Sequence, residues 1–158
     1  MFIKSVYTLA ALTILIFIIG VTAYAQQRFT VAPGAVSVIV TSSVPVGGYQ
    51  LTISFDPTLL ELDKTKVTGG TGAGFTRGPH GLAIDSRLGI VTINSFQVGN
   101  SPRGAFPATV LPFAGLKAGT STLRITQSTI VDTNGNEIPA TTARITLSSD
   151  NVRVTARP

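Results

Sequence analysis

Hydrophobic and polar residues alternate strictly in short segments of this chain, and no other feature constrains the fold as much. In residues 49–55, YQLTISF, every second side chain is hydrophobic. One set is Tyr49, Leu51, Ile53 and Phe55, and the other is Gln50, Thr52 and Ser54. Successive side chains of a β-strand point to opposite faces, so the first set is predicted to face a core and the second to face solvent.

Other short segments have the same strand-like composition. They are residues 35–43, 82–86, 90–96, 109–115, 121–132, 141–149 and 151–156. Residues 87–89 form a connection of hairpin length, and Asn134-Gly135 is a strong turn signal between the two long segments. Pro107 and Pro112 predict an edge strand or an irregular path for the segment that contains them. Eight or nine short strands without a helix predict an all-β, two-sheet sandwich.

The sequence predicts the structure of two connections between strands, a turn and a long loop. Asp56-Pro57 predicts a turn, after which Leu59, Leu60 and Leu62 are expected to pack back onto the core. Residues 69–81, GGTGAGFTRGPHG, contain too much glycine for the interior of a strand and predict a long loop.

The first 25 residues predict an export signal. Lys4 precedes an apolar run over residues 6–21, and Ala23-Tyr24-Ala25 matches a cleavage site before Gln26. The alternative is an uncleaved membrane anchor, because the run approaches the ~20 residues of a spanning helix. We favour cleavage, because small residues stand where signal peptidase needs them. The expected organisation is a signal-peptide helix over 1–25 and one domain over 26–158, secreted or held at the cell surface.

The composition excludes several classes of protein. The formal net charge is +5, yet the basic residues are scattered and form no run, so we expect no nucleic-acid binding. The chain has no cysteine, which rules out disulfides and thiolate metal sites. A domain of about 130 residues can bury a sufficient core without such cross-links.

No residue pattern predicts an active site. Asp56, Glu61 and Asp63 are clustered carboxylates, but nothing in the sequence places a cleft beside them, and a turn and solvated positions explain them better. His80 is the only histidine and lies in the glycine-rich loop, so it cannot build a multi-histidine metal site. The glycines of residues 69–74 lack the lysine and the helix of a phosphate-binding loop. We therefore predict no catalytic residue.

The segment from Asp132 to Glu137 superficially resembles a calcium loop. An EF-hand loop needs glycine at its sixth position and a bidentate glutamate at its twelfth. Here Gly135 is fourth and Ala143 is twelfth, so a hairpin turn is favoured. We predict no metal site and no cofactor.

Three segments, in this order, resemble cohesin domains. Residues 47–62, GGYQLTISFDPTLLEL, match a glycine, an aromatic-bearing strand, Asp-Pro and a leucine-rich return. Residues 108–125 resemble the strand that follows in cohesins, and residues 121–147 resemble the carboxy-terminal hairpin. The resemblance covers about residues 36–155. It implies a nine-stranded jelly-roll sandwich that binds a dockerin, a small calcium-loaded module, on a flat sheet face without catalysis.

The resemblance also implies which residues form the partner-binding face. Carried over by position, these are Gln50, Thr52, Ser54, Thr92 and Asn94. Cohesins often carry acidic residues on this face, whereas these five are neutral and mostly hydroxyl-bearing.

Two other functions share this fold class. A carbohydrate-binding module would bind polysaccharide through exposed aromatic rings, but the chain has no tryptophan, and Tyr49 is expected on the core face. Phe29, Phe75 and Phe106 are the aromatic residues expected to be exposed, and the alternatives for a shallow sugar site are Phe75 or polar side chains. A structural cell-surface protein would instead assemble through its sheet edges. Membrane contact is expected only if the leader is retained.

Overall fold

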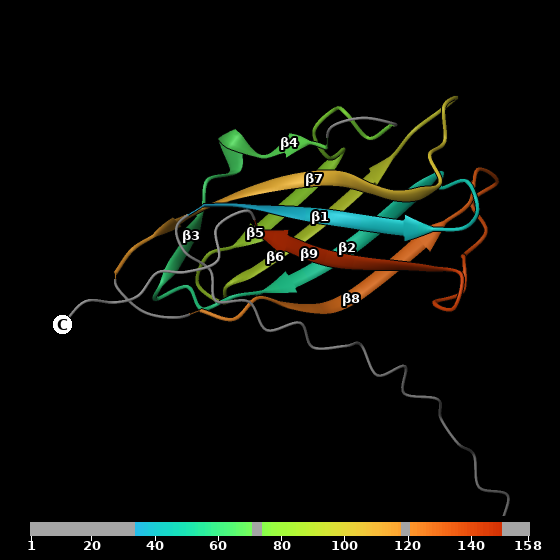
Figure 1. Ribbon diagram of the computed structural model, residues 1–158. Coiled ribbons are helices and arrows are strands. Elements are labelled where there is room, and N and C mark those ends of the chain that lie inside the picture. Colours follow the sequence, from blue (N-terminus) through green and yellow to red (C-terminus); the bar gives the residue numbers. More distant parts are fainter. Residues whose placement is uncertain (1–33, 71–73, 118–120, 150–158) are drawn as a thin grey trace, which may run out of the picture.

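The computed structural model describes residues 34–70, 74–117 and 121–149, and within them the chain is almost entirely β (Figure 1). The strands are β1 (Gly34–Ser42), β2 (Gly48–Ser54), β3 (Leu60–Leu62), β4 (Thr68–Gly69), β5 (Gly81–Asp85), β6 (Ile90–Phe96), β7 (Gly104–Gly115), β8 (Arg124–Val131) and β9 (Ala143–Ser149). One 3-10 turn, η1 (Lys64–Lys66), lies between β3 and β4. The predicted all-β class is confirmed. The expected signal helix and the strand over 151–156 lie outside these residues.

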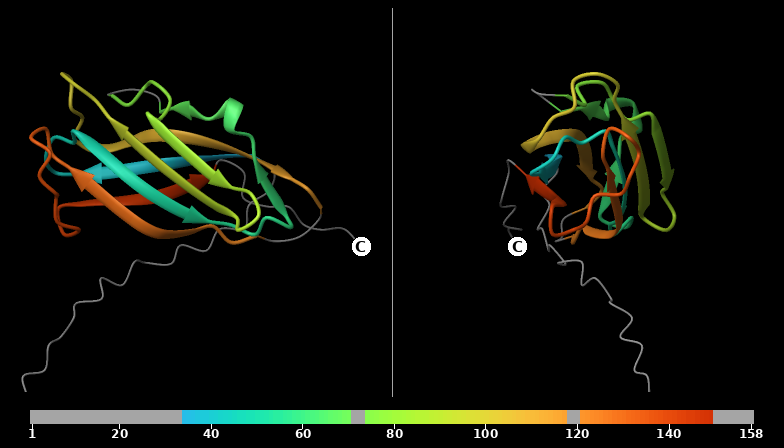
Figure 2. Two further views of the ribbon diagram at one scale, coloured as in Figure 1. Left: turned by 180° about the vertical axis from the view of Figure 1, so that it is seen from behind. Right: turned by 90° about the vertical axis from the view of Figure 1, so that its right-hand side faces the viewer.

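The strands form two antiparallel sheets that face each other. Sheet A has the order β3-β7-β1-β9, with β4 also paired to β7, and sheet B has the order β5-β6-β2-β8. The end-on view in Figure 2 shows the two layers enclosing a common interior. This is the two-sheet sandwich that the sequence predicts.

The core lies between the sheets and comes from alternate positions of the central strands. In β2, Tyr49, Leu51 and Ile53 are buried, and Phe55 is buried just after the strand. Val36, Val38 and Val40 of β1, Val91 and Ile93 of β6, and Leu111 and Phe113 of β7 complete its centre. Leu60 and Leu62 are buried after the Asp56-Pro57 turn, as predicted. Burial of such side chains, at about 25 cal/mol per Å² of apolar area, stabilises the sandwich.

β7 corrects one expectation. The strand is not at an edge, because it pairs with β1 on one side and with β3 and β4 on the other. Its path is irregular, as predicted, with a register shift opposite Val38 and Ile39. The Pro112 carbonyl accepts the Asp63 N–H at 3.3 Å, so the main chain of Pro112 faces the gap between β3 and β4. A proline nitrogen at that gap deprives no strand of a hydrogen bond, which explains how proline is accommodated inside the sheet.

The segment after β8 corrects another expectation from the sequence. Asn134-Gly135 does form a turn, with Gly135 at φ +85°, and Ile138 donates its N–H to the Ile130 carbonyl at 2.8 Å. However, β8 joins β2 in sheet B whereas β9 joins β1 in sheet A. The turn is therefore a connection between sheets, and the expected carboxy-terminal hairpin of two paired long strands is wrong.

An aromatic cluster closes one end of the sandwich. Phe75 packs edge-on against Tyr49 at 5.3 Å between ring centroids and stacks on Phe106 at 5.8 Å. Tyr49 belongs to sheet B and Phe106 to sheet A, so the Phe75 ring packs the loop before β5 against both sheets. The described residues between β4 and β5, residue 70 and residues 74–80, belong to no strand, in agreement with the loop predicted for the glycine-rich segment.

Within the described parts of the chain, no helix has the length and apolar character needed to cross a bilayer.

Candidate functional site

The outer face of sheet B brings together all five residues that the resemblance places on the binding face. Gln50 of β2 lies directly opposite Asn94 of β6, and Thr52 lies opposite Thr92. Ser54 completes the row on β2, opposite Ile90. Gln50 and Asn94 are exposed and the other three of the five are half-buried, so together they form a continuous outward-facing surface.

The flanking strands extend this face in both directions. On β8, Thr129 lies opposite Gln50 and Gln127 lies opposite Thr52. On β5, Ala83 lies opposite Thr92. Sequence reasoning missed these three residues, because their positions depend on strand pairing between segments far apart in the chain.

Neutral hydrogen-bonding groups dominate the chemistry of this face. The Thr52 and Thr92 hydroxyls lie 3.3 Å apart and share a hydrogen bond across the strands. Strands β2 and β6 carry no charged residue. The strand residues Asp85 and Arg124 lie opposite Ile90 and Ser54, so these two charges stand at one end. Such a surface can form many hydrogen bonds with a protein without desolvating a charge.

The opposite end of the face is apolar. Phe96 ends β6 with 56% of its surface exposed, and Val98 beyond it is 93% exposed. Gly48 lies between Phe96 and Val131 in the neighbouring strands and adds no side chain. The His80 ring stacks on Phe96 at 3.8 Å between centroids, and the amide N–H of Phe96 donates to His80 Nδ1 at 3.3 Å.

The structure corrects the expected aromatic exposure. Phe75 and Phe106 are each only 4% exposed, because both belong to the core cluster with Tyr49. A shallow sugar site built on an exposed Phe75 ring is therefore wrong. Phe29 lies outside the described residues, and the aromatic residue that the sequence failed to identify is Phe96.

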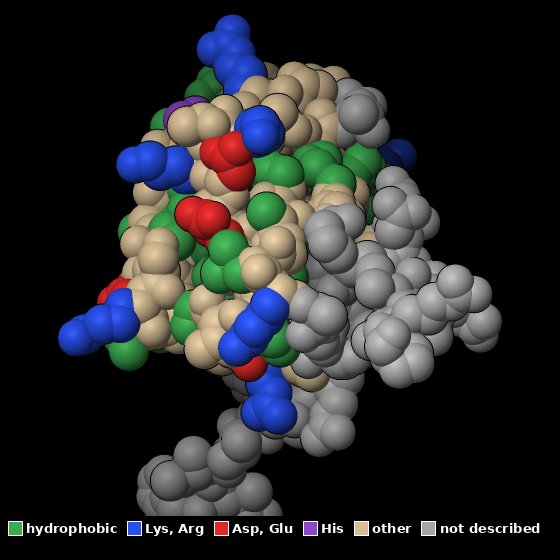
Figure 3. Space-filling model, turned by 90° about the vertical axis from the view of Figure 1, so that its left-hand side faces the viewer, with side chains coloured by type: hydrophobic (Ala, Val, Ile, Leu, Met, Phe, Trp, Pro, Cys, Tyr) green, Lys and Arg blue, Asp and Glu red, His purple; other side chains and the backbone are tan. Residues whose placement is uncertain are grey.

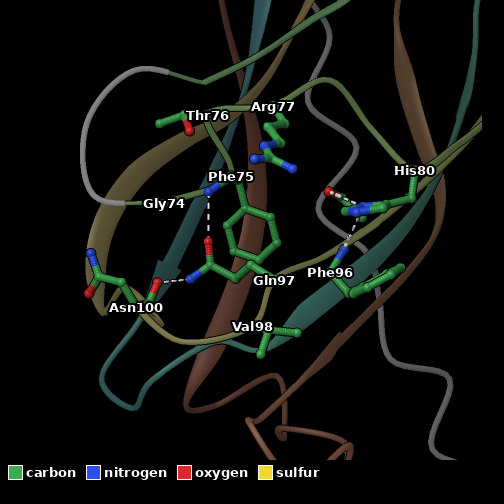
Figure 4. Close-up of a pocket in the computed structure, with 10 residues that line it drawn as sticks. Gly74, Phe75, Thr76, Arg77, His80, Phe96, Gln97, Val98 and Asn100 are labelled. Atoms are coloured by element: carbon green, nitrogen blue, oxygen red, sulfur yellow. Dashed lines mark hydrogen bonds between the residues drawn. The ribbon is translucent and has the colours of Figure 1, made fainter.

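A hollow of about 500 Å³ lies beside Phe96, between the loop before β5 and the segment after β6 (Figure 4). Gln97 lines the hollow. Its side-chain Oε1 accepts the Phe75 N–H at 2.7 Å, and its Nε2 donates to the Asn100 carbonyl. Arg77 and His80 line the hollow from the loop. Figure 4 shows the Arg77 guanidinium directed into the space between Phe75 and His80.

Two of the three carboxylates considered for catalysis stabilise turns, and the third, Glu61, is an exposed residue of β3. Asp56 accepts hydrogen bonds from the hydroxyl and N–H of Thr58, which lower the pKa of its carboxyl group. Asp63 accepts from the hydroxyl of Thr65 and from Lys66, and these bonds lower its pKa to about 2. A general acid needs a raised pKa, so both shifts go against that role.

The Asp132 carboxylate is likewise part of a turn. Its Oδ1 accepts the N–H groups of Asn134 and Asn136, and the bonds from Asn136 are the main cause of its lowered pKa. Among the residues that the structure describes, no three histidine, aspartate or glutamate side chains converge.

Charged side chains elsewhere are mixed in sign. Figure 3 shows the end of the sandwich that carries β3, where Lys and Arg side chains project singly among acidic and hydrophobic ones. The single ion pair of the described residues, Lys66 with Asp63 at 2.9 Å, is exposed and contributes little to stability.

This arrangement defines a class of protein, an all-β sandwich with a neutral polar face on one sheet. No family model matches the chain, and no curated protein matches it by sequence. Solved structures do match. They include a type II cohesin–X–dockerin complex from Acetivibrio cellulolyticus, with a TM-score of 0.55 and 18% identity over 71% of this chain and 91% of that chain. The second type II cohesin module of a cellulosomal adaptor scaffoldin from the same organism has a TM-score of 0.55 and 18% identity, over 71% and 84% of the two chains.

A non-cellulosomal cohesin from the hyperthermophilic archaeon Archaeoglobus fulgidus is similar too. Its TM-score is 0.52 at 17% identity, over 72% of this chain and 75% of that chain. The chain therefore has a cohesin-like fold, and the resemblance to cohesins is confirmed at the level of fold.

Proposed function

We propose that this protein is a non-catalytic docking module that binds a protein partner through the outer face of sheet B. The observation that carries the proposal is the continuous row formed by Gln50, Asn94, Thr52 and Thr92, with exposed Phe96 at its end. A flat face of hydrogen-bonding groups with an apolar anchor at its border has the composition of a protein interface.

The fold supports one class of partner. Structures with this fold include a cohesin bound to an X-dockerin module, and we propose a dockerin-like module as the partner. An interface of this kind buries roughly 800 Å² on each partner. The neutrality of β2 and β6 implies a partner surface of matching neutral polar groups, because an unpaired charge pressed onto this face would lose hydration without compensation.

We further propose that the domain acts outside the cell. The apolar run over residues 6–21 and the cleavage pattern at residues 23–25 support export. Mass spectrometry of the protein recovered from its source would test this part, because cleavage leaves Gln26 as the first residue. An intact leader on the recovered protein would favour the anchored alternative.

Affinity capture tests the partner class. Residues 26–158 are immobilised, and the exported proteins of the source organism are passed over them, once with calcium and once with a chelator. We expect retention, only with calcium, of a protein that carries a dockerin-like module. Retention of nothing, or the same retention with chelator, would refute a dockerin partner.

Two matched variants test the face. Thr92→Lys introduces a charge at the centre of the outer face of sheet B, whereas Thr146→Lys introduces the same charge on the outer face of sheet A. Both threonines are half-buried strand residues, and Thr146 lies opposite Ile39 in the register of β9 with β1. We expect T92K to abolish capture and T146K to retain it. Equal loss in both variants would contradict the assigned face.

The exposed Phe96 ring also favours a second candidate, a carbohydrate-binding module of the same fold. A polysaccharide ligand would stack on that ring and would require no calcium. Depletion of the protein by insoluble polysaccharides, lost in Phe96→Ala and unaffected by chelator, would establish this function in place of docking.

A further inference from the structure

We propose that the hollow beside Phe96 receives a carboxylate side chain of the protein partner. This inference rests on the proposed docking function and names the chemistry of one contact within it. The hollow adjoins the binding face directly, because Phe96 belongs both to its lining and to the outer row of sheet B.

Arg77 gives the hollow a positive charge. Among the residues that the structure describes, it is the only formally charged one in the lining. Its guanidinium has no hydrogen bond or ion pair within the described parts of the chain, where the one ion pair lies between Lys66 and Asp63. A guanidinium has five N–H donors arranged to bind both oxygens of a carboxylate at once. An unpaired arginine directed into a hollow therefore selects an anionic group.

The side chains left for a ligand can all donate. The Gln97 side chain, which would otherwise offer an acceptor, is occupied on both sides by Phe75 and Asn100. His80 Nδ1 accepts the Phe96 N–H, so in the neutral ring the proton lies on Nε2, which can donate. Arg77 only donates, and the Thr76 and Asn100 side chains, which also line the hollow, can donate as well as accept. A carboxylate, which supplies acceptors alone, therefore matches the donors of this lining.

The wall of the hollow at Phe75 is held in place before binding. Phe75 has φ +51°, a left-handed conformation that is costly for a residue other than glycine. It is fixed there by its packing with Tyr49 and Phe106 and by the bond from its N–H to Gln97. A site whose walls are already fixed loses little conformational entropy on binding.

The hollow is open, and one cation supplies limited affinity by itself. A free carboxylate is therefore expected to bind weakly, and the same group on a docked partner to bind as part of a larger contact. This difference favours an acidic side chain of a protein over a free small anion as the occupant.

The experiment titrates the isotope-labelled exported protein with two small probes and follows the backbone amides of Phe75 and Phe96 by NMR. The first probe is N-acetyl-aspartate N-methylamide, and the second is its neutral isostere, N-acetyl-asparagine N-methylamide, at constant ionic strength. We expect saturable shifts with the aspartate probe, with a dissociation constant in the millimolar range, and at least about fivefold weaker binding of the asparagine probe.

Arg77→Gln should weaken binding of the aspartate probe by about tenfold, because it removes the charged fork and keeps a polar side chain. Arg103→Gln is the matched control, since Arg103 is exposed in the connection between β6 and β7 and does not line the hollow. Equal binding of the two probes would overturn the proposal. So would equal effects of R77Q and R103Q, which would indicate only a general attraction of anions.

The outcomes separate this inference from the proposed function. If the probes behave as expected but no partner is captured, the hollow binds carboxylates and the docking function fails. If a dockerin-like partner is captured equally well by the R77Q variant and by the unaltered protein, docking stands and the proposed contact is refuted.

Discussion

The Tyr49 phenol and the Thr109 hydroxyl form a hydrogen bond that joins the two sheets inside the sandwich. Tyr49 belongs to β2 in sheet B and Thr109 to β7 in sheet A, and both side chains are buried. The Thr109 hydroxyl donates to the Ala108 carbonyl at 2.8 Å, so the Tyr49 hydroxyl is the donor of the bond between the sheets. Both hydroxyls are thereby satisfied in an otherwise apolar interior.

A double-mutant cycle on this pair should show coupling. Tyr49→Phe removes the donor but leaves Thr109 bonded to Ala108, and we expect a loss of about 1 kcal/mol. Thr109→Val leaves the tyrosine hydroxyl buried without a partner and should cost about 1–3 kcal/mol. The double variant should lose less than the sum of the two, as measured by urea denaturation. Strict additivity would mean that the two hydroxyls do not interact.

Tyr49 should also make stability depend on pH in the alkaline range. Burial raises the pKa of its phenol to about 12, from about 10 in the unfolded chain. Below pH 10 both states keep the proton. Between pH 10 and 12 the unfolded state loses its proton first, so the free energy of unfolding should fall by roughly 1.4 kcal/mol per pH unit.

The Tyr49→Phe variant is the control for that pH dependence, because it lacks the phenol hydroxyl and keeps every other ionisable group. Tyr49 is the only tyrosine of residues 26–158, so ultraviolet absorbance of this part of the chain, prepared alone, reports its ionisation directly. A midpoint near pH 10 in the folded protein, or the same pH dependence in both proteins, would contradict a buried phenol.

Gly89 should not tolerate a side chain. It lies in the β5–β6 turn at φ +65°, and a Cβ there would come within 2.1 Å of the Phe55 carbonyl oxygen and 2.7 Å of Pro57 Cδ. Gly89→Ala combines left-handed strain with overpacking and should cost about 3 kcal/mol. Gly135→Ala is the matched control, since Gly135 also has a positive φ but has open space around it.

We expect Gly135→Ala to cost only the strain, about 1–2 kcal/mol. Thermal or urea denaturation of both variants measures the difference. If the two variants were equally destabilised, the close approach of Gly89 to Phe55 would contribute nothing to the loss of stability in Gly89→Ala.

The sequence predicted the parts of the fold that depend on local patterns. The alternation of residues 49–55 identified both faces of β2, because a strand places successive side chains on opposite sides whatever it pairs with. The return of Leu60 and Leu62 to the core was predictable from the turn at Asp56-Pro57 for the same local reason.

Pairing between distant segments was not predictable. β8 and β9 are neighbours in sequence with a turn between them, yet they belong to different sheets. The central position of β7 was missed because Pro112 is accommodated by the break between β3 and β4, a feature of another part of the chain. Likewise, Gln127 and Thr129 join the candidate face only through the register of β8 with β2, which shifts near Thr52.

The aromatic prediction failed for a related reason. Phe75 stands in a glycine-rich loop and was expected at the surface, but its left-handed backbone turns the ring into the core. Phe96 ends a strand in the outward position, and no following strand covers it within the described residues. Sequence alone does not reveal such conformations.

Gln97 should control the loop before β5. Its carboxamide joins the Phe75 N–H to the Asn100 carbonyl, so Gln97→Ala removes two contacts and leaves the Phe75 N–H without an acceptor. We expect a loss of about 1–2 kcal/mol and faster hydrogen exchange at the Phe75 amide. Gln127→Ala is the control, because that exposed side chain on β8 has no such bonds. Unchanged exchange at Phe75 in Q97A would refute this role.

Phe96 should be the energetic anchor of partner binding. Its ring is 56% exposed at the apolar end of the candidate face, so Phe96→Ala removes little of the core and should change the stability of the free protein only slightly. In a docked complex the same ring is buried, and its removal should weaken affinity by roughly 10–100-fold. Leu116→Ala is the matched control, since Leu116 is 54% exposed and follows β7 of sheet A. Isothermal calorimetry with the captured partner measures both variants, and equal losses of affinity would show that Phe96 is not part of the contact.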